Sequence, residues 1–195
     1  MLDPALFSDL RCLHLMGSTL SISDQTMDTG RQALDLALQA GAKFSFDPNL
    51  RPELLSVEKA RDVFEPFISA ADVFIPTESE LLSLTGYDAE LEAIEFLLTQ
   101  KSDRVIVVTK GARGSVVYTA QDTFNIPGFI VDEIDPTGAG DCFDAGFLSG
   151  WLGGLPVNEA ARLANACGAL AVTKQGPMAG AEKMARVQEF MVSLA

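Results

Sequence analysis

A run of glycines and small residues between two aspartates is the part of the sequence best suited to chemistry. It reads Asp135-Pro-Thr-Gly-Ala-Gly-Asp141. Residues Gly138, Ala139 and Gly140 leave the start of a helix bare, so successive backbone N–H groups can face an anion without Cβ atoms in the way. The dipole of that helix, worth about half a positive charge at its start, favours a phosphate or a developing negative charge. The segment therefore predicts an anion cradle.

The second aspartate, Asp141, would lie beside the bound anion. A carboxylate is a poor ligand for an anion, but it can act as a general base that takes a proton from an attacking hydroxyl group. A cradle combined with a base indicates phosphoryl transfer. The alternative is that Asp141 only occupies the first helical turn, where an acid stabilises the helix by a few tenths to about 1 kcal/mol. The chain has no G-x-x-x-x-G-K-[ST] motif, which excludes a Walker-type nucleotide site.

Composition and charge restrict the function classes. The 195 residues contain 14 Lys and Arg against 27 Asp and Glu, a net charge of −13, so nucleic acid and anionic membrane surfaces are not expected partners. Cys12, Cys142 and Cys167 have no CxxC spacing, which argues against a disulfide framework or a zinc site. The one histidine, His14, is expected to be a hydrogen-bonded strand residue. With no signal pattern and no long apolar run, we expect a cytoplasmic protein without a membrane segment.

Apolar strands alternate with amphipathic helices along the chain. Strands are expected at 12–16, 43–46, 72–75, 104–109, 115–119 and 123–126. Helices are expected at 25–39, 57–69, 78–84, 89–100, 139–152, 157–174 and 181–194. The fourth strand is a β-branched run typical of a parallel sheet buried on both faces, and the last two read as antiparallel additions joined by a turn. The alternation predicts a three-layer α/β/α sandwich around a mostly parallel sheet, as one domain over residues 1–195.

The segment 135–141, followed by an aromatic and small-residue helix, resembles the C-terminal signature of the PfkB (ribokinase-like) carbohydrate kinases. The resemblance implies that Asp141 is the catalytic base on a sugar hydroxyl and that the amides of 138–140 form the anion hole for the transferred γ-phosphate. It also implies a monovalent-cation site, for K⁺, near Asp135 and Thr137. The implied cofactors are ATP and Mg²⁺.

Three other stretches fit the same family in the same order. Residues 109–114, Thr-Lys-Gly-Ala-Arg-Gly, match the loop that lies along the nucleotide, and a glycine turn between two strands is the alternative. Asn165, in a helix of small residues, matches the position that contacts the adenine side, and close helix packing is the alternative. Residues 174–177 resemble the loop that closes the nucleotide and cation sites. The implied nucleotide contacts are Thr109, Lys110, Gly111, Arg113, Gly114, Gly140 and Asn165.

The stretch 46–52, Phe-Asp-Pro-Asn-Leu-Arg-Pro, bears on the substrate. A strand ends here, two prolines stiffen the loop, and Arg51 is presented at the carboxyl edge of the sheet, where open α/β folds bind ligands. A guanidinium can bind a carboxylate or a phosphate with two hydrogen bonds. The alternative is a surface arginine paired with an acid such as Glu53. The stretch resembles the 2-keto-3-deoxygluconate kinase and fructokinase branch, which implies substrate contacts from Arg51 and Asn49 beside Asp141.

The segment after the strand expected at 72–75 departs from the family pattern. Where the family has Asn-x-x-Glu after a strand, this sequence has Thr77-Glu78-Ser79-Glu80. The resemblance gives Glu80 a part in organising Mg²⁺ through water. A Thr followed three residues later by Glu is also an N-terminal capping box, which explains both residues without a metal.

The resemblance implies an ATP-dependent kinase that phosphorylates a primary hydroxyl of a ketose or keto-sugar acid, with 2-keto-3-deoxygluconate favoured. The alternatives are a catalytically silent nucleotide-binding fragment and a kinase for fructose or another sugar or riboside. The match covers the later part of the family's fold, so we expect its C-terminal portion, without the N-terminal strands, the Gly-Gly sugar-binding motif and the lid. A homodimer, which lid pairing commonly forms in the family, is a further candidate assembly.

Overall fold

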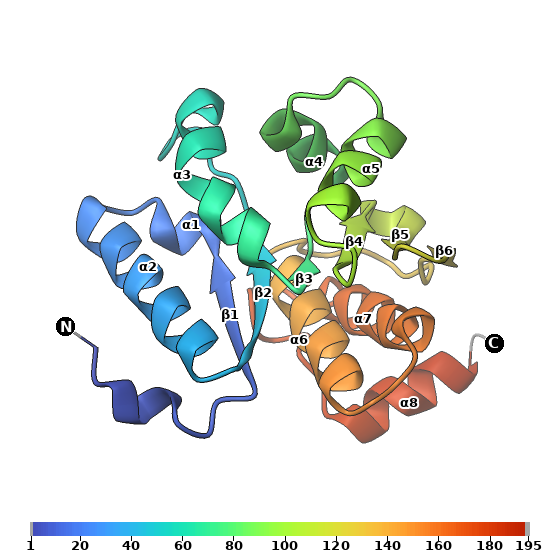
Figure 1. Cartoon of the computed structure of the whole chain (residues 1–195). Helices are drawn as coiled ribbons and strands as arrows, with labels where there is room; N and C mark the ends of the chain where they lie inside the picture. Colours follow the sequence, from blue (N-terminus) through green and yellow to red (C-terminus); the bar gives the residue numbers. More distant parts are fainter. Residues whose placement is uncertain (1, 194–195) are drawn as a thin grey trace. The chain divides into compact units, whose positions relative to one another are not determined.

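A computed structural model describes residues 2–193, in which the chain divides into two units (Figure 1). The first unit comprises Met1–Val108 and Tyr118–Asp122, and the second comprises Thr109–Val117 and Thr123–Ala195. Each unit is described by itself. The expectation of one domain over residues 1–195 stays a prediction.

The sheet of the first unit consists of parallel strands in the order β1-β2-β3-β4. Their bounds are Cys12–Met16, Lys43–Asp47, Val73–Phe74 and Val105–Thr109. The β-branched residues 105–108 are all buried, as their pattern predicts. His14 lies within hydrogen-bonding distance of Ser45, with 3.1 Å between His14 Nδ1 and Ser45 Oγ, which confirms the expected strand histidine. Parallel strands bring the loops after β1, β2 and β3 to one edge of this sheet.

Helices connect these strands. Their bounds are α1 Gly17–Leu20, α2 Asp24–Gln39, α3 Val57–Ala70, α4 Glu78–Thr85 and α5 Glu90–Gln100, preceded by a short 3-10 helix, η1, at Pro4–Phe7. Capping boxes start α2, with Ser23 and Thr26, and α4, with Thr77 and Glu80. Phenylalanines of β2, β3 and α3 pack together in the core between these elements in stacked, tilted and edge-to-face pairs, with ring centroids 5.4 to 6.4 Å apart.

The second unit contains a strand pair and a group of helices. Their bounds are β5 Gly114–Tyr118, β6 Thr123–Pro127, α6 Ala139–Leu152, α7 Val157–Ala171 and α8 Met184–Ser193, with a 3-10 helix, η2, at Gly111–Arg113. β5 and β6 are neighbours, and the turn between them is closed by the Thr119 N–H on the Asp122 carbonyl at 2.9 Å. Helices α6 and α7 touch through small residues, since a Cβ added to Gly146 would lie 2.8 Å from Cys167 Sγ.

Each expected strand and helix is found, and its ends differ from the prediction by at most three residues over the described part of the chain. α7 ends at Ala171 and not at residue 174, because the Thr173 N–H donates to the Leu170 carbonyl three residues back, which tightens the last turn. The Val172 carbonyl just beyond it accepts from the N–H groups of Ile134 and Asp135. α8 begins at Met184 and not at 181, and the predicted end at Leu194 lies outside the described residues. The short helices η1 and α1 were not expected.

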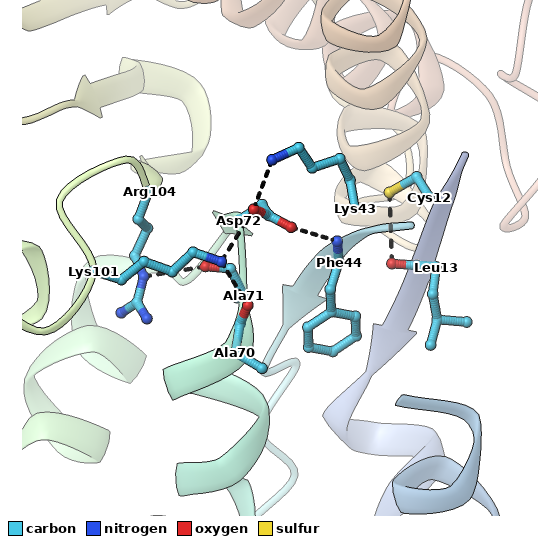
Figure 2. Close-up of polar contacts among 9 residues, drawn as sticks. All are labelled: Cys12, Leu13, Lys43, Phe44, Ala70, Ala71, Asp72, Lys101 and Arg104. Atoms are coloured by element: carbon cyan, nitrogen blue, oxygen red, sulfur yellow. Dashed lines mark hydrogen bonds and ion pairs between the residues drawn. The ribbon is translucent and has the colours of Figure 1, made fainter. Parts of the chain in front are cut away.

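Asp72, which directly precedes β3, links the start of β2 to the end of α5 in the first unit (Figure 2). Its Oδ2 accepts the Phe44 N–H at 2.8 Å, and its Oδ1 accepts from Lys43 Nζ and Lys101 Nζ, each at 3.0 Å. Nearby, the fully buried Arg104 donates to the backbone carbonyls of Ser69 and Ala71. Burial alone would raise the pKa of Asp72, but the hydrogen bonds from Phe44 and the two lysines hold it below its ordinary value.

Replacing Asp72 with alanine is expected to lower the free energy of unfolding by about 2–3 kcal/mol near neutral pH, because three hydrogen bonds to a charged group disappear. The folded pKa is depressed, so this contribution is present above the unfolded pKa of about 3.9 and disappears as the pH falls below it. Urea titrations between neutral and acid pH measure both effects, with the exposed Asp62→Asn as the control. Equal stability of Asp72→Ala and the control would contradict the role.

Candidate active site

The start of α6 is an open helix N-terminus in the second unit. Gly138 is its N-cap with φ +83°, and no side chain caps the helix. A Cβ at Gly138 would lie 2.1 Å from the Pro177 carbonyl oxygen, so both the backbone conformation and the close approach require glycine. A Cβ at Gly140 would meet nothing within 4 Å, so the space beside it is open. This is the bare helix start that the sequence predicts.

The amide groups at this helix start differ in what they do. The Ala139 N–H donates to the Pro136 carbonyl at 3.2 Å, and the first helical bond runs from the Cys142 N–H to the Gly138 carbonyl at 3.0 Å. The N–H groups of Gly138 and Gly140 make no hydrogen bond within the described residues. The structure therefore leaves the two glycine amides, and not that of Ala139, as the predicted anion-hole donors without a protein acceptor.

Asp141 occupies the first turn of α6 and is exposed. Its carboxylate forms no hydrogen bond or ion pair within residues 2–193. A carboxylate without a protein partner beside an uncapped helix start can accept a proton from a bound hydroxyl group. The catalytic base thus stays a prediction with suitable geometry, beside the alternative of a simple first-turn acid.

Asp135 joins two loops that the sequence placed together. Its Oδ1 accepts the Thr137 N–H at 2.9 Å and its Oδ2 accepts the Gly176 N–H at 2.8 Å. Hydrogen bonds from Thr137, and then from Gly176, hold the pKa of Asp135 below its ordinary value. Each carboxylate oxygen keeps a second lone pair, so this ionised group fits the predicted K⁺ site near Asp135 and Thr137.

No group of three or more His, Cys, Asp or Glu side chains that could hold a metal ion exists among the residues that the structure describes. Mg²⁺ is commonly bound in proteins through one or two carboxylates together with substrate phosphates. Binding of Mg²⁺ together with nucleotide phosphates stays a prediction.

Glu80 has its carboxylate occupied by backbone and hydroxyl donors in the first unit. Oε2 accepts from Thr77 N and Thr77 Oγ1, each at 2.8 Å, and Oε1 accepts the Leu50 N–H at 2.6 Å. The capping-box alternative is thus confirmed for Thr77 and Glu80. A water-mediated role of Glu80 toward Mg²⁺ stays a prediction.

The predicted nucleotide loop, residues 109–114, forms a tight turn between β4 and β5. The Lys110 N–H donates to the Gly114 carbonyl at 2.8 Å around η2. A Cβ at Gly114 would lie 2.2 Å from the Ile126 carbonyl oxygen, which ties the turn to β6. The glycine-turn alternative is confirmed as structure. Nucleotide contacts from Thr109, Lys110, Gly111, Arg113 and Gly114 stay predictions.

Asn165 is nearly buried on α7, with 7% of its surface exposed. Its Nδ2 donates to the carbonyl oxygens of Ile126 and Pro127 at 3.1 and 3.2 Å. Asn165 therefore holds the end of β6 against α7, and the close-packing alternative is confirmed. Its predicted contact with adenine stays a prediction.

The predicted substrate residues follow β2 in the first unit. Asn49 has φ +35°, the one positive φ outside glycine among the described residues, and its N–H donates to Asp47 Oδ1 at 2.8 Å. Arg51 is exposed and forms no hydrogen bond or ion pair through its side chain in the described part of the chain, so the expected alternative pairing with Glu53 is wrong. Strained backbone residues cluster at binding sites, and a guanidinium can bind a carboxylate or a phosphate. Substrate contacts from Asn49 and Arg51 stay a prediction.

The chain matches the sequence profile described as pfkB family carbohydrate kinase over residues 5–184. The chain belongs to the pfkB family of carbohydrate kinases. It is 36% identical over 155 residues to the ATP-dependent ribose-1-phosphate kinase of Halopiger xanaduensis and 32% identical over 200 residues to probable fructokinase-5 of Arabidopsis thaliana. These alignments cover 80% and 98% of the chain.

Among solved structures, this pfkB family chain is similar to a putative ribokinase II from E. coli in complex with ATP and Mg²⁺. The TM-score is 0.92 at 33% identity, over 98% of the chain. This similarity confirms the predicted ribokinase-like α/β fold with a mostly parallel sheet. The chain spans 48% and 61% of the two curated relatives and 62% of the E. coli structure.

The sequence did not show two links in the first unit, the bond from the Leu50 N–H to Glu80 and the contact of Gly17 with Pro48. Both involve backbone atoms, which residue types do not display. Throughout residues 2–193, no helix has the length and apolar character needed to cross a bilayer.

Proposed function

We propose that this pfkB family chain carries the catalytic part of an ATP-dependent kinase for a ketose or keto-sugar acid. The observation that carries the proposal is the uncapped start of α6, where open space at Gly140 lies in the same helical turn as the partner-free carboxylate of Asp141. ATP and Mg²⁺ are named with the E. coli relative, which supports these cofactors for the proposal.

In the proposed reaction, Asp141 takes the proton of a primary sugar hydroxyl as its oxygen attacks the γ-phosphorus of ATP. The new O–P bond forms as the bond to the β,γ-bridging oxygen breaks, so the products are ADP and a sugar phosphate. The amides of Gly138 and Gly140 stabilise the charge on the transferred group. Mg²⁺ carried by the nucleotide would neutralise phosphate charge, and an ionised Asp135 would hold K⁺.

Isothermal titration calorimetry tests this proposal. We expect the chain to bind ATP·Mg²⁺ and, in its presence, a ketose or 2-keto-3-deoxygluconate. A second candidate, a nucleotide-binding piece without turnover, is favoured by the share of the relatives that the chain spans, 48% to 62%. Nucleotide binding without sugar binding would support that second candidate. Absence of nucleotide binding would contradict both.

Arg51 bears on which sugar is bound. Its free guanidinium can bind the carboxylate of 2-keto-3-deoxygluconate, whereas fructose offers no such group. We therefore propose a keto-sugar acid as the favoured substrate. The names of the two curated relatives keep fructose and a ribose derivative as alternatives.

Replacing Arg51 with alanine is expected to raise the dissociation constant or KM for the keto-sugar acid by about 10- to 100-fold, because a charged hydrogen-bonded pair is lost. The constants for fructose should change by less than about threefold. Titrations of both sugars measure the difference, with the exposed Arg31→Ala as the control for charge. Equal losses for both sugars would contradict the assignment.

The cellular location and the oligomeric state of the protein are also proposals. The described thiols of Cys12, Cys142 and Cys167 are all unpaired, which supports the predicted cytoplasmic location. A homodimer also stays a prediction, and light scattering at several concentrations tests it.

A further inference from the structure

Three loops meet at the carboxyl edge of the first unit's sheet, and one carboxylate links two of them. We call residues 47–51 the substrate loop. Glu80 Oε1 accepts the Leu50 N–H of this loop at 2.6 Å, across 30 positions of sequence. Glu80 Oε2 accepts from Thr77 at the start of α4. The carboxylate therefore joins the start of α4 to the loop that follows β2.

The substrate loop has a backbone that must be held in place. Asn49 adopts φ +35°, which side chains other than glycine rarely adopt, and its N–H is held by Asp47 at 2.8 Å. On the other side, a Cβ at Gly17 would lie 2.2 Å from the Pro48 carbonyl oxygen, so the start of α1, directly after β1, touches the substrate loop. A strained backbone residue persists where neighbouring contacts hold it in place. Glu80 provides one such contact, because it binds the N–H of Leu50, the residue after Asn49.

Two side chains of the substrate loop are left for a ligand. Neither Asn49 nor Arg51 forms a side-chain hydrogen bond or ion pair among the described residues. They flank Leu50, the residue whose N–H is bound by Glu80. The directions of both side chains therefore depend on the backbone bond that Glu80 accepts.

We propose that Glu80 is a positioning residue, which fixes the substrate loop through the Leu50 N–H so that Asn49 and Arg51 meet the sugar. This inference rests on the proposed function for the identity of the ligand. In this role both carboxylate oxygens of Glu80 must accept hydrogen bonds, one from Leu50 and the other from Thr77. A glutamine would turn its NH₂ group, which cannot accept, toward one of these two donors. The positioning role also differs from a role in organising Mg²⁺.

Two variants separate these roles. Glu80→Gln keeps the size of the side chain and removes one acceptor oxygen. Glu80→Asp keeps the carboxylate, and with it the chemistry for Mg²⁺, but shortens the reach to Leu50. Thr77→Ala is the matched control, because it removes the capping hydroxyl and leaves the Leu50 bond in place. Circular dichroism confirms folding of each variant.

The first measurement is amide hydrogen exchange of residues 49–51 in the chain without ligand. Both Glu80 variants should speed exchange there by about tenfold or more, and Thr77→Ala should not, because a local hydrogen bond is lost. Unchanged exchange in the two Glu80 variants would overturn the proposal, whether or not the chain binds a sugar.

The second measurement is the dependence of activity on sugar and on Mg²⁺. We expect KM for the sugar to rise by about tenfold in both Glu80 variants, with kcat and the Mg²⁺ concentration at half activity unchanged. A shifted Mg²⁺ requirement with an unchanged sugar KM would overturn the proposal in favour of a metal role. If the parent chain binds no sugar, the proposed function fails, and hydrogen exchange decides the loop contact by itself.

Discussion

Replacing Asp141 with asparagine is expected to lower kcat by about 10²- to 10⁴-fold, the usual contribution of a general base. The exposed carboxylate has no partner in the described chain, so its loss should not disturb folding. Asparagine cannot take the hydroxyl proton, although it has nearly the same shape. Binding of ATP·Mg²⁺ should therefore stay close to that of the parent, and the loss should fall on the chemical step.

Steady-state kinetics and nucleotide titrations measure these two effects separately. Glu159→Gln is the matched control, because Glu159 is an exposed acid in the first turn of α7, at a helix start that has Pro156 as its N-cap. If Asp141→Asn and Glu159→Gln had the same rate as the parent, Asp141 would only be a first-turn acid.

Replacing Gly140 with alanine is expected to lower kcat by about 10²- to 10³-fold, a loss as large as that of one oxyanion donor, because the methyl group would keep the phosphate away from the amide that alanine retains. The added methyl group would meet no protein atom within 4 Å, so it would occupy the space proposed for the γ-phosphate. The free energy of unfolding should stay equal or rise by up to about 1 kcal/mol, since alanine is the better helix former. Steady-state kinetics and thermal melts measure these two effects, and ATP titrations measure the nucleotide affinity.

Gly138→Ala is the informative comparison for Gly140→Ala. Its methyl group would lie 2.1 Å from the Pro177 carbonyl oxygen at a residue with φ +83°, so we expect a loss of about 1–3 kcal/mol of stability. Gly138→Ala therefore tests a role in stability, and Gly140→Ala tests a role in binding the anion. Parental turnover and nucleotide affinity in Gly140→Ala would show that the anion does not bind beside this helix start.

The fold was largely predictable because its signals are local. The β-branched run of β4 predicts a buried strand, and the α6 helix was predicted with its observed bounds, Ala139–Leu152. The end of α7 was not predictable from residue types, since it lies where the Thr173 N–H donates to Leu170, and the Val172 carbonyl just beyond it accepts from the distant Ile134 and Asp135. Local sequence patterns do not show which distant N–H groups donate to a given carbonyl.

The candidate site was predictable where glycines and charges carry it, and less so where polar side chains have two uses. For Gly138 the residue type alone indicates the role, because the structure leaves no room for a Cβ atom at this position. Asn165 and Glu80 are polar in either role, and their bonds to β6 and to Leu50 become visible only in three dimensions. The small residues of the predicted helix at 157–174 indicate close packing of this helix. The burial of Asn165 and its bonds to β6 agree with that prediction.

We propose above that this chain transfers the γ-phosphoryl group of ATP to a sugar hydroxyl with Asp141 as the base. Mass spectrometry of 2-keto-3-deoxygluconate and of fructose, incubated with ATP·Mg²⁺ and the chain, tests it most directly. We expect one of these sugars to gain a phosphoryl group with the parent chain, and far less of that product to form with Asp141→Asn. Nucleotide binding with neither sugar phosphorylated would contradict the claim.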